Sequence, residues 1–234
     1  MNNRIIYDCY IGPPVYGIIT AEDTLQRRSI FLEQLKNLIG FRTYIPELDH
    51  EGFRFYEVGY FMELLYKGSP EAFTMLNMAE DFVQQSSAEI RILKDVKDKF
   101  ISKAIPAYLL GYSKGVQDTL TEKDSFFNDE KSIKKLGYDK NVAYICSLYL
   151  RLAKDVLLFS EFRVERSDAE ILTAIKDGMF SKETIIKEID EQVTEVEELL
   201  RVSKLPPHPS KDFINDTLFK IRGIELDNEI TRIK

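Results

Sequence analysis

Residues 11–31 read Ile11-Gly12-Pro13-Pro14-Val15-Tyr16-Gly17-Ile18-Ile19-Thr20-Ala21-Glu22-Asp23-Thr24-Leu25-Gln26-Arg27-Arg28-Ser29-Ile30-Phe31. A β-branched and aromatic run at residues 4–11 leads into this stretch and predicts a strand that ends at the glycine turn. A second extended run follows near residues 25–32. A glycine turn after a strand can hold a phosphate through exposed backbone N–H groups, although two glycines five residues apart usually mark only a turn. The stretch therefore predicts strand, turn, loop and strand.

One further strand and a series of helices follow. Residues 53–58 are rich in aromatic residues and predict a third strand. The helical run at residues 60–66 stops at Lys67-Gly68-Ser69-Pro70, where the glycine predicts a C-cap and the proline a breaker. From about residue 70 the pattern is helical almost throughout. The first part of the chain is thus expected to be a small sheet with helices against it.

Two amphipathic helices stand out in the second half. In residues 140–158 and 181–202, apolar side chains recur at spacings of three and four, a pattern that usually faces a core. A proline-rich linker follows, and Ser210 is placed to cap a last helix over residues 211–222. The sequence therefore predicts an α+β protein. We expect two domains, 1–120 and 121–234, with the boundary in the polar stretch that begins at Thr121.

Composition excludes several classes of protein. The 234 residues are 44% hydrophobic, enough for a sizeable core, but no stretch approaches the roughly 20 apolar residues of a membrane span. A net charge of −7 argues against sequence-independent binding to duplex nucleic acid, which requires basic residues to neutralise phosphates. Cys9 and Cys146 lie far apart and His50 and His208 are isolated, so a disulfide framework, a thiolate or histidine metal site and a Ser-His-Asp triad are poorly supported. We expect a cytoplasmic protein.

The turn and the strand after it resemble the predicted nucleotidyltransferase family that includes the RlaP-like proteins. Members carry a Gly-Ser-x-x-Tyr-Gly turn and then a Thr-Pro-Glu-Ser-Asp-x-Asp run that leads into a strand ending in Gly-Val-Phe. The residues that match this frame are Gly12, Tyr16, Gly17, Thr20, Glu22, Arg28 and Phe31. Further matches keep the family's order: Lys67-Gly68-Ser69-Pro70, Phe100-Ile101-Ser102-Lys103, Gly111-Tyr112 and Gly137-Tyr138-Asp139. The resemblance covers residues 4–222 and implies the small mixed sheet of the polymerase-beta-type nucleotidyltransferase superfamily.

The resemblance also implies a metal site that this chain has lost. In such enzymes the Asp-x-Asp pair, on one face of a strand, and a third carboxylate hold two Mg²⁺ ions that bridge the nucleotide phosphates. Here the pair falls on Thr24 and Gln26, and the third position falls near Gly52. The turn serine is Pro13, which has no backbone N–H for a phosphate. Other charged positions of the family are also neutral here, namely Thr74, Asn141, Val142, Ile145 and Leu148.

Some contacts to a nucleotide could nevertheless be retained. The resemblance gives the candidate nucleotide-binding residues as Gly12, Tyr16, Gly17, Arg28, Ser102 and Lys103. Lys103 with Ser102 is the first choice for an anion contact and Arg28 the next, against the commoner alternative of a surface charge or a structural salt bridge. Tyr16 and Tyr112 could stack on a base, although aromatic residues more often pack in a core.

Acidic residues elsewhere could rebuild a metal site. Glu22 and Asp23 are adjacent and would point to opposite faces of a strand. Glu47, Asp49 and Glu51 alternate, so they would share one face if the segment were extended. A solvated acidic loop is the favoured alternative for that segment.

Two classes of function follow. The favoured one is a catalytically degenerate nucleotidyltransferase-like protein that binds a nucleotide or a protein partner, as a regulator, inhibitor or decoy, with no cofactor. The alternative is an active enzyme that uses Mg²⁺ to transfer NMP from an NTP to RNA, protein or a small acceptor. Proteins of the family that this chain resembles occur in both bacteria and phages. A phage origin would favour a role in interference with a host system. Phe126 and Phe127 are candidates for a contact surface, and the oligomeric state is open.

Overall fold

The computed structural model of the protein describes residues 4–21, 24–39, 41, 45–50, 52–122, 127 and 129–233. Its five-stranded sheet has the order β3-β4-β2-β1-β5. The strands are β1 (Arg4–Ile11), β2 (Gln26–Leu32), β3 (Glu47–His50), β4 (Phe53–Glu57) and β5 (Val83–Ser86). β2 and β4 are parallel, whereas the other neighbours are antiparallel, so the sheet is mixed. The three strands expected from the sequence are confirmed as β1, β2 and β4.

The two edge strands correct the expectations for their segments. Val83–Ser86 lies where the sequence predicted helix almost throughout, yet it is β5 and pairs with β1. This segment forms a strand because of a tertiary contact: the backbone N–H and C=O groups at the edge of β1 are hydrogen-bonded by pairing with this short polar segment. Glu47–His50 is not the solvated loop that we favoured but β3, which pairs with β4 across a turn at Gly52 with φ of 81°.

Ten α-helices are described. They are α1 (Leu35–Ile39), α2 (Val58–Lys67), α3 (Pro70–Leu76), α4 (Ala88–Lys94), α5 (Ala104–Gln117), α6 (Glu130–Leu136), α7 (Lys140–Phe159), α8 (Ala169–Lys176), α9 (Lys182–Val202) and α10 (Lys211–Ile233). The expected C-cap is confirmed at Gly68, which ends α2 with φ of 82°. Ser181 caps the start of α9, where its hydroxyl accepts from the Thr184 N–H. Ser210 accepts from the Phe213 N–H at 3.4 Å, and α10 runs well past residue 222.

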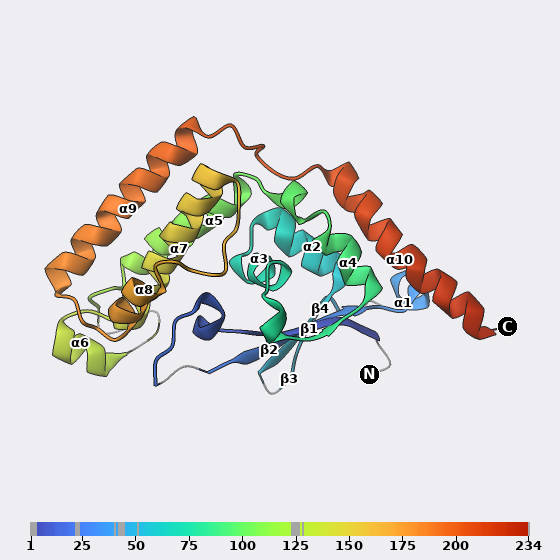
Figure 1. Ribbon diagram of the computed structural model, residues 1–234, viewed down its shortest axis with the longest axis horizontal. Coiled ribbons are helices and arrows are strands. Elements are labelled where there is room, and N and C mark those ends of the chain that lie inside the picture. The colour runs from blue at the N-terminus through green and yellow to red at the C-terminus, as the bar shows by residue number, and fades with distance from the viewer. Residues whose placement is uncertain are drawn as a thin grey trace.

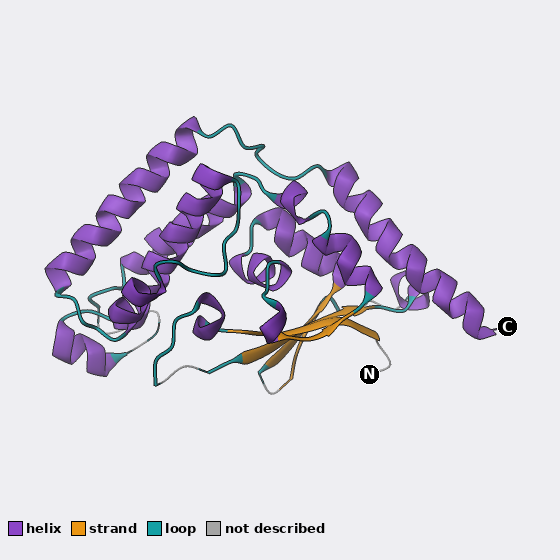
Figure 2. Cartoon of the chain, in the orientation of Figure 1, coloured by secondary structure: helices purple, strands orange, loops and turns teal. Residues whose placement is uncertain are grey.

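The helices form two groups around the sheet. α2, α3 and α4 pack over the sheet, while α5, α7, α8 and α9 lie together at the end of the molecule near the β1–β2 turn (Figure 1). After α9 the chain crosses back, and α10 packs against α2 and α4. Figure 2 shows the strands gathered in a single layer, with the helices lying mainly to one side of it. The expected α+β fold, with a mixed sheet, packed helices and a helical C-terminal part, is confirmed.

The predicted division after residue 120 falls between α5 and α6. α5, from the expected first domain, packs against α7 and α9 of the second. Buried residues of both parts, such as Phe73 and Leu150, belong to one hydrophobic cluster. The helical part is therefore closely packed against the sheet part, and a surface between the two can be shaped by both. No helix in the described ranges combines the length and apolar character that a membrane crossing requires.

Candidate functional site

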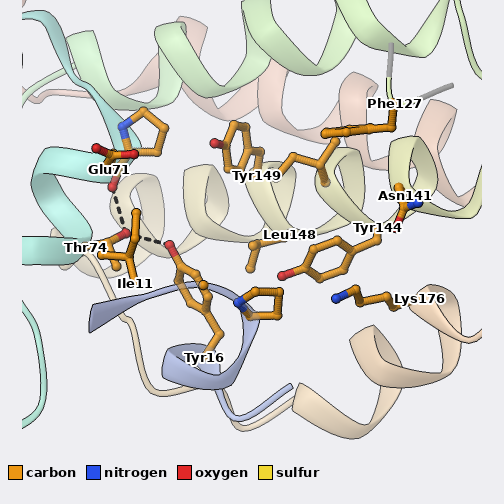
Figure 3. A pocket seen from close by; sticks show the side chains of 14 residues that line it. Ile11, Tyr16, Glu71, Thr74, Phe127, Asn141, Tyr144, Leu148, Tyr149 and Lys176 are labelled. Carbon is orange, nitrogen blue, oxygen red and sulfur yellow. Dashed lines mark hydrogen bonds between the residues drawn. The ribbon is translucent and has the colours of Figure 1, made fainter. Parts of the chain in front are cut away.

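A cleft of about 290 Å³ opens between the sheet and the helical part. Its walls come from the β1–β2 turn, from α3, from α7 and from the end of α8 (Figure 3). The lining residues are Ile11, Gly12, Pro13, Tyr16, Pro70, Glu71, Thr74, Phe127, Asn141, Tyr144, Ile145, Leu148, Tyr149 and Lys176. Because these side chains are mostly apolar or aromatic, the cleft has the composition of a small-molecule site.

The glycine turn forms one wall of the cleft. Gly12 has φ of 136°, and a Cβ there would lie 2.7 Å from the Thr24 carbonyl oxygen, so no other residue fits. A 3₁₀ turn follows, in which the N–H groups of Val15, Gly17 and Ile18 donate to carbonyl oxygens of the turn itself. Since prolines 13 and 14 have no N–H, the turn offers few donors for the phosphate that glycine turns often hold.

Tyr16 anchors the turn to α3. Its hydroxyl lies 2.5 Å from the Thr74 hydroxyl, which itself donates to the Pro70 carbonyl at 2.7 Å. Burial raises the pKa of Tyr16 to about 12, so the phenol stays protonated at neutral pH. Tyr16, which was predicted to stack on a base, thus lines the cleft, and its hydroxyl is hydrogen-bonded to Thr74.

Two of the three positions where the resemblance places metal carboxylates, Gln26 and Gly52, lie together in the structure. β2 and β4 run parallel, and Arg28 lies beside Arg54. Two residues earlier on each strand, the same register places Gln26 beside Gly52. Gln26 also pairs with Ile11 of β1, and the Thr24 carbonyl approaches Gly12. Gln26 and Gly52 therefore lie together and line a separate hollow with Asp49 and Arg54, whereas Thr24 lies against the turn that walls the cleft.

A guanidinium group lies between two of them. The buried Arg28 side chain donates to the Gln26 side-chain oxygen at 2.7 Å and, more weakly, to the Gly52 carbonyl at 3.4 Å. Its Nε donates to Glu71 Oε1 at 3.0 Å, and Glu71 also accepts from the Tyr56 hydroxyl. The Glu71 carboxylate, which lines the cleft, is thus already engaged by a cation and a phenol.

The acids on β3 are engaged as well. Asp49 lies 3.4 Å and Glu47 3.9 Å from nitrogens of Arg54 on the adjacent strand. Glu22, Asp23 and Glu51 lie outside the described residues, as does Phe126. Within the described ranges, no three His, Cys, Asp or Glu side chains gather as a metal site would require.

The predicted nucleotide-binding residues do not all reach the cleft. Gly12 and Tyr16 line it, and Arg28 contacts it through Glu71. Lys103 and Ser102 lie at the start of α5, where the Lys103 N–H donates to the carbonyl of residue 206 in the linker before α10 and Ser102 is fully buried. They are not among the residues that line the cleft.

Two other candidates pack beside the cleft. Gly17 ends the turn in the left-handed region, and a Cβ there would lie 3.4 Å from Ala169 at the start of α8. The Tyr112 ring packs against Tyr149, with centroids 5.1 Å apart, so it supports a lining residue and does not line the cleft itself.

The most prominent lining residues were not predicted from the sequence. Tyr149 was expected in a core-facing stripe and Tyr144 was not singled out, yet both project from α7 into the cleft (Figure 3). Burial raises the pKa of both phenols, which keeps them neutral hydrogen-bonding groups. Lys176, at the end of α8, holds its ammonium 5.3 Å from the centre of the Tyr144 ring. Tyr149 shares the apolar stripe of residues 140–158 with core residues, so its spacing alone gives no signal for a cleft.

An ion network fixes the helices that carry these residues. Arg166, before α8, pairs with Asp155 of α7 and with Asp168 at the start of α8. Arg151 of α7 joins Asp168 at 2.9 Å to Glu188 of α9 at 2.6 Å. Partial burial raises the pKa of Asp168, but the hydrogen bonds and charges of the two arginines outweigh it and leave that pKa below its usual value. The network therefore holds α8 and its lysine against α7.

Comparison of the chain with protein-family models, with curated proteins and with solved structures finds no match.

Proposed function

We propose that this chain is a nucleotidyltransferase-like protein that binds a ligand in the cleft between sheet and helices and does not carry out metal-dependent nucleotide transfer. The observation that carries the proposal is the environment of Gln26 and Gly52, where metal carboxylates would be needed. These neutral positions lie side by side, and the Arg28 guanidinium donates to both. The resemblance supplies the expectation of a transferase scaffold, and these contacts support the loss of its chemistry.

Electrostatics makes a divalent cation unfavourable at this place. Mg²⁺ requires oxygen ligands with negative charge, and Thr24 and Gln26 have none. A unit positive charge a few ångströms away repels a divalent ion by several kcal/mol at an effective dielectric constant of about 20. The Glu71 carboxylate, 3.0 Å from Arg28, offsets part of this repulsion, but it is itself engaged by Arg28 and by the Tyr56 hydroxyl. Mg²⁺ would be needed only under the alternative, an active enzyme. The contacts of Glu47 and Asp49 with Arg54 do not favour that alternative.

The cleft favours a small ligand over a protein partner as the bound species. It is walled by several segments from both parts of the chain, whereas protein interfaces are generally broad and open. A protein that binds a ligand without converting it would act as a regulator or decoy. Both cysteines are free and buried, which agrees with the cytoplasmic location that we propose.

Titration of the wild-type protein with MnCl₂ tests the loss of the metal site. We expect no saturable heat of binding up to about 1 mM Mn²⁺. A Kd of about 1 mM corresponds to a binding free energy of about −4.1 kcal/mol. Mn²⁺ is chosen because it accepts the same carboxylate ligands as Mg²⁺ and generally binds them more tightly. Saturable binding that disappears in an Asp49→Asn variant would show that the β3 acids have rebuilt the site, and would contradict the proposal.

A further inference from the structure

Most polar side chains that line the cleft already have a partner within the protein. The Glu71 carboxylate accepts from Arg28 and from the Tyr56 hydroxyl. The Tyr16 hydroxyl is hydrogen-bonded to Thr74. To bind a ligand, each of these groups would have to give up or share a contact that the fold already makes.

The opposite end of the cleft is engaged in the same way (Figure 3). Asn141 donates to Asp129 at 3.3 Å. The Lys176 ammonium lies 5.3 Å from the centre of the Tyr144 ring, and Lys176 has a further interaction partner as well. The charged side chains of the described lining, Glu71 and Lys176, are thus both engaged. A charged ligand would lose its water here without gaining an unpaired counter-ion, which is costly.

Two hydroxyl groups of the lining differ from the rest. Tyr144 and Tyr149 project from α7 into the cleft, and the structure gives neither hydroxyl a hydrogen-bond partner among the residues that it describes (Figure 3). Tyr144 is only 7% exposed. Burial raises the pKa of both phenols, so they stay protonated at neutral pH. A largely buried hydroxyl without a partner costs free energy, which a ligand that hydrogen-bonds to it recovers.

The remainder of the cleft is apolar and small. Ile11, Pro13, Ile145 and Leu148 supply aliphatic surface beside the tyrosine rings. The volume of about 290 Å³ lies just below the range of about 300–1,000 Å³ that ligand pockets generally span. The cleft therefore suits a small molecule with an apolar body.

We propose that the cleft binds a small uncharged molecule, with an apolar body and a polar group such as an amide that hydrogen-bonds to the phenol hydroxyls of Tyr144 and Tyr149. The inference rests on the proposed function, since it takes the cleft as the site of binding. It goes beyond that function by naming the class of ligand. Nucleotides are poor ligands on this basis, because each phosphate brings negative charge that meets no unpaired cation among the described lining residues.

NMR titration of the isotope-labelled protein with matched probes tests the class of ligand. Benzamide and nicotinamide carry an uncharged amide on a ring. Benzoate and nicotinate have nearly the same shape with a negative charge, and benzamidine has it with a positive charge. We expect at least one amide to bind with Kd below about 10 mM and its charged counterparts to bind at least about tenfold more weakly. A smaller difference, or no binding of either amide at about 10 mM, would overturn the inference.

The double variant Tyr144→Phe/Tyr149→Phe tests the role of the hydroxyls, since it removes both of them and keeps both rings. It should weaken binding of the amide by at least about fivefold. Tyr108→Phe, at an exposed tyrosine of α5 outside the described lining, is the matched control and should leave the affinity unchanged. Equal affinity of the double variant and the wild type would contradict the assignment of the hydroxyls to the ligand.

The melting temperature without ligand shows whether these hydroxyls stabilise the fold instead. Because neither has a partner in the described residues, the double variant should melt no lower than the wild type. Tyr16→Phe loses the hydrogen bond to Thr74 and should melt about 2–4 °C lower. A comparable fall in the double variant would overturn the inference.

The outcomes separate this inference from the proposed function. Failure of the amides to bind, or tighter binding of a charged probe, leaves the proposal of a lost metal site intact. Binding of an NTP that requires added Mg²⁺ would contradict both.

Discussion

Replacement of Arg166 by leucine is expected to destabilise the protein by about 3 kcal/mol. The Arg166 side chain is 6% exposed and pairs with Asp155 and Asp168, whose side chains are 16% and 19% exposed. Removal of the guanidinium leaves Asp155 largely desolvated without its cation, whereas Asp168 keeps Arg151. At about 2–4 °C per kcal/mol for a chain of this size, the melting temperature should fall by about 6–12 °C.

The matched control is Arg163→Leu, three residues earlier. Arg163 is 42% exposed and pairs with Glu161, which is 59% exposed, so its loss should cost less than about 1 kcal/mol. Low pH gives a second check. Because the pKa of Asp168 is depressed, its stabilisation is complete above its unfolded pKa of about 3.9 and is lost as pH falls through the folded value. The wild type should therefore lose its advantage over Arg166→Leu under acid conditions, and equal melting temperatures at pH 7 would refute the structural role of the network.

Carboxylates restored at positions 24, 26 and 52 should bind Mn²⁺ only weakly as long as Arg28 is present. The variant Thr24→Asp/Gln26→Asp/Gly52→Asp places acids at all three positions. Gly52 has open space around its Cβ position, and aspartate tolerates positive φ better than most residues. Arg28 already donates to the residue 26 side chain at 2.7 Å, so we expect it to neutralise the new aspartate there. Adding Arg28→Ala should therefore strengthen Mn²⁺ binding at least about tenfold, or about 1.4 kcal/mol.

Calorimetric titration with MnCl₂ compares these variants with the wild type and with Arg28→Ala alone. Arg28→Ala alone should show no saturable Mn²⁺ binding, since it adds no carboxylate to hold the metal. It also reports the cost of leaving Glu71 without its cation, which its melting temperature measures. If the three carboxylates bind Mn²⁺ equally well with and without Arg28, then the guanidinium does not oppose the metal. If neither variant binds Mn²⁺ although both fold, the register that brings Gln26 beside Gly52 is contradicted.

Local signals in the sequence predicted much of the fold. Gly68 and Ser210 were recognised as caps because capping depends on residues within one turn of the helix end. The strands β1, β2 and β4 were recognised by their β-branched and aromatic residues. β5 was not, because the polar residues of Val83–Ser86 become a strand only through pairing with β1. Tertiary pairing overrides weak local preference in such a segment.

The candidate site was less predictable, because its parts are distant in the chain. The resemblance located Gly12 and Tyr16, which line the cleft, and the neutral positions 26 and 52, which lie together in a separate hollow. Glu71 is joined to Arg28 across 43 residues, a contact that no local pattern indicates. Tyr149 could not be told from a core residue, since a side chain at the rim of an apolar stripe has the same spacing whether it faces a core or a cleft.

Thermal unfolding of the wild-type protein with each NTP, with and without Mg²⁺, tests the loss of metal-dependent chemistry most directly. A working two-metal site would bind nucleotide and metal together, and a ligand at 100 times its Kd adds about 2.7 kcal/mol of stability. For this chain that corresponds to a shift of about 5–11 °C. We predict that no NTP produces a shift that depends on Mg²⁺. A rise of several degrees that requires both Mg²⁺ and an NTP would contradict the account.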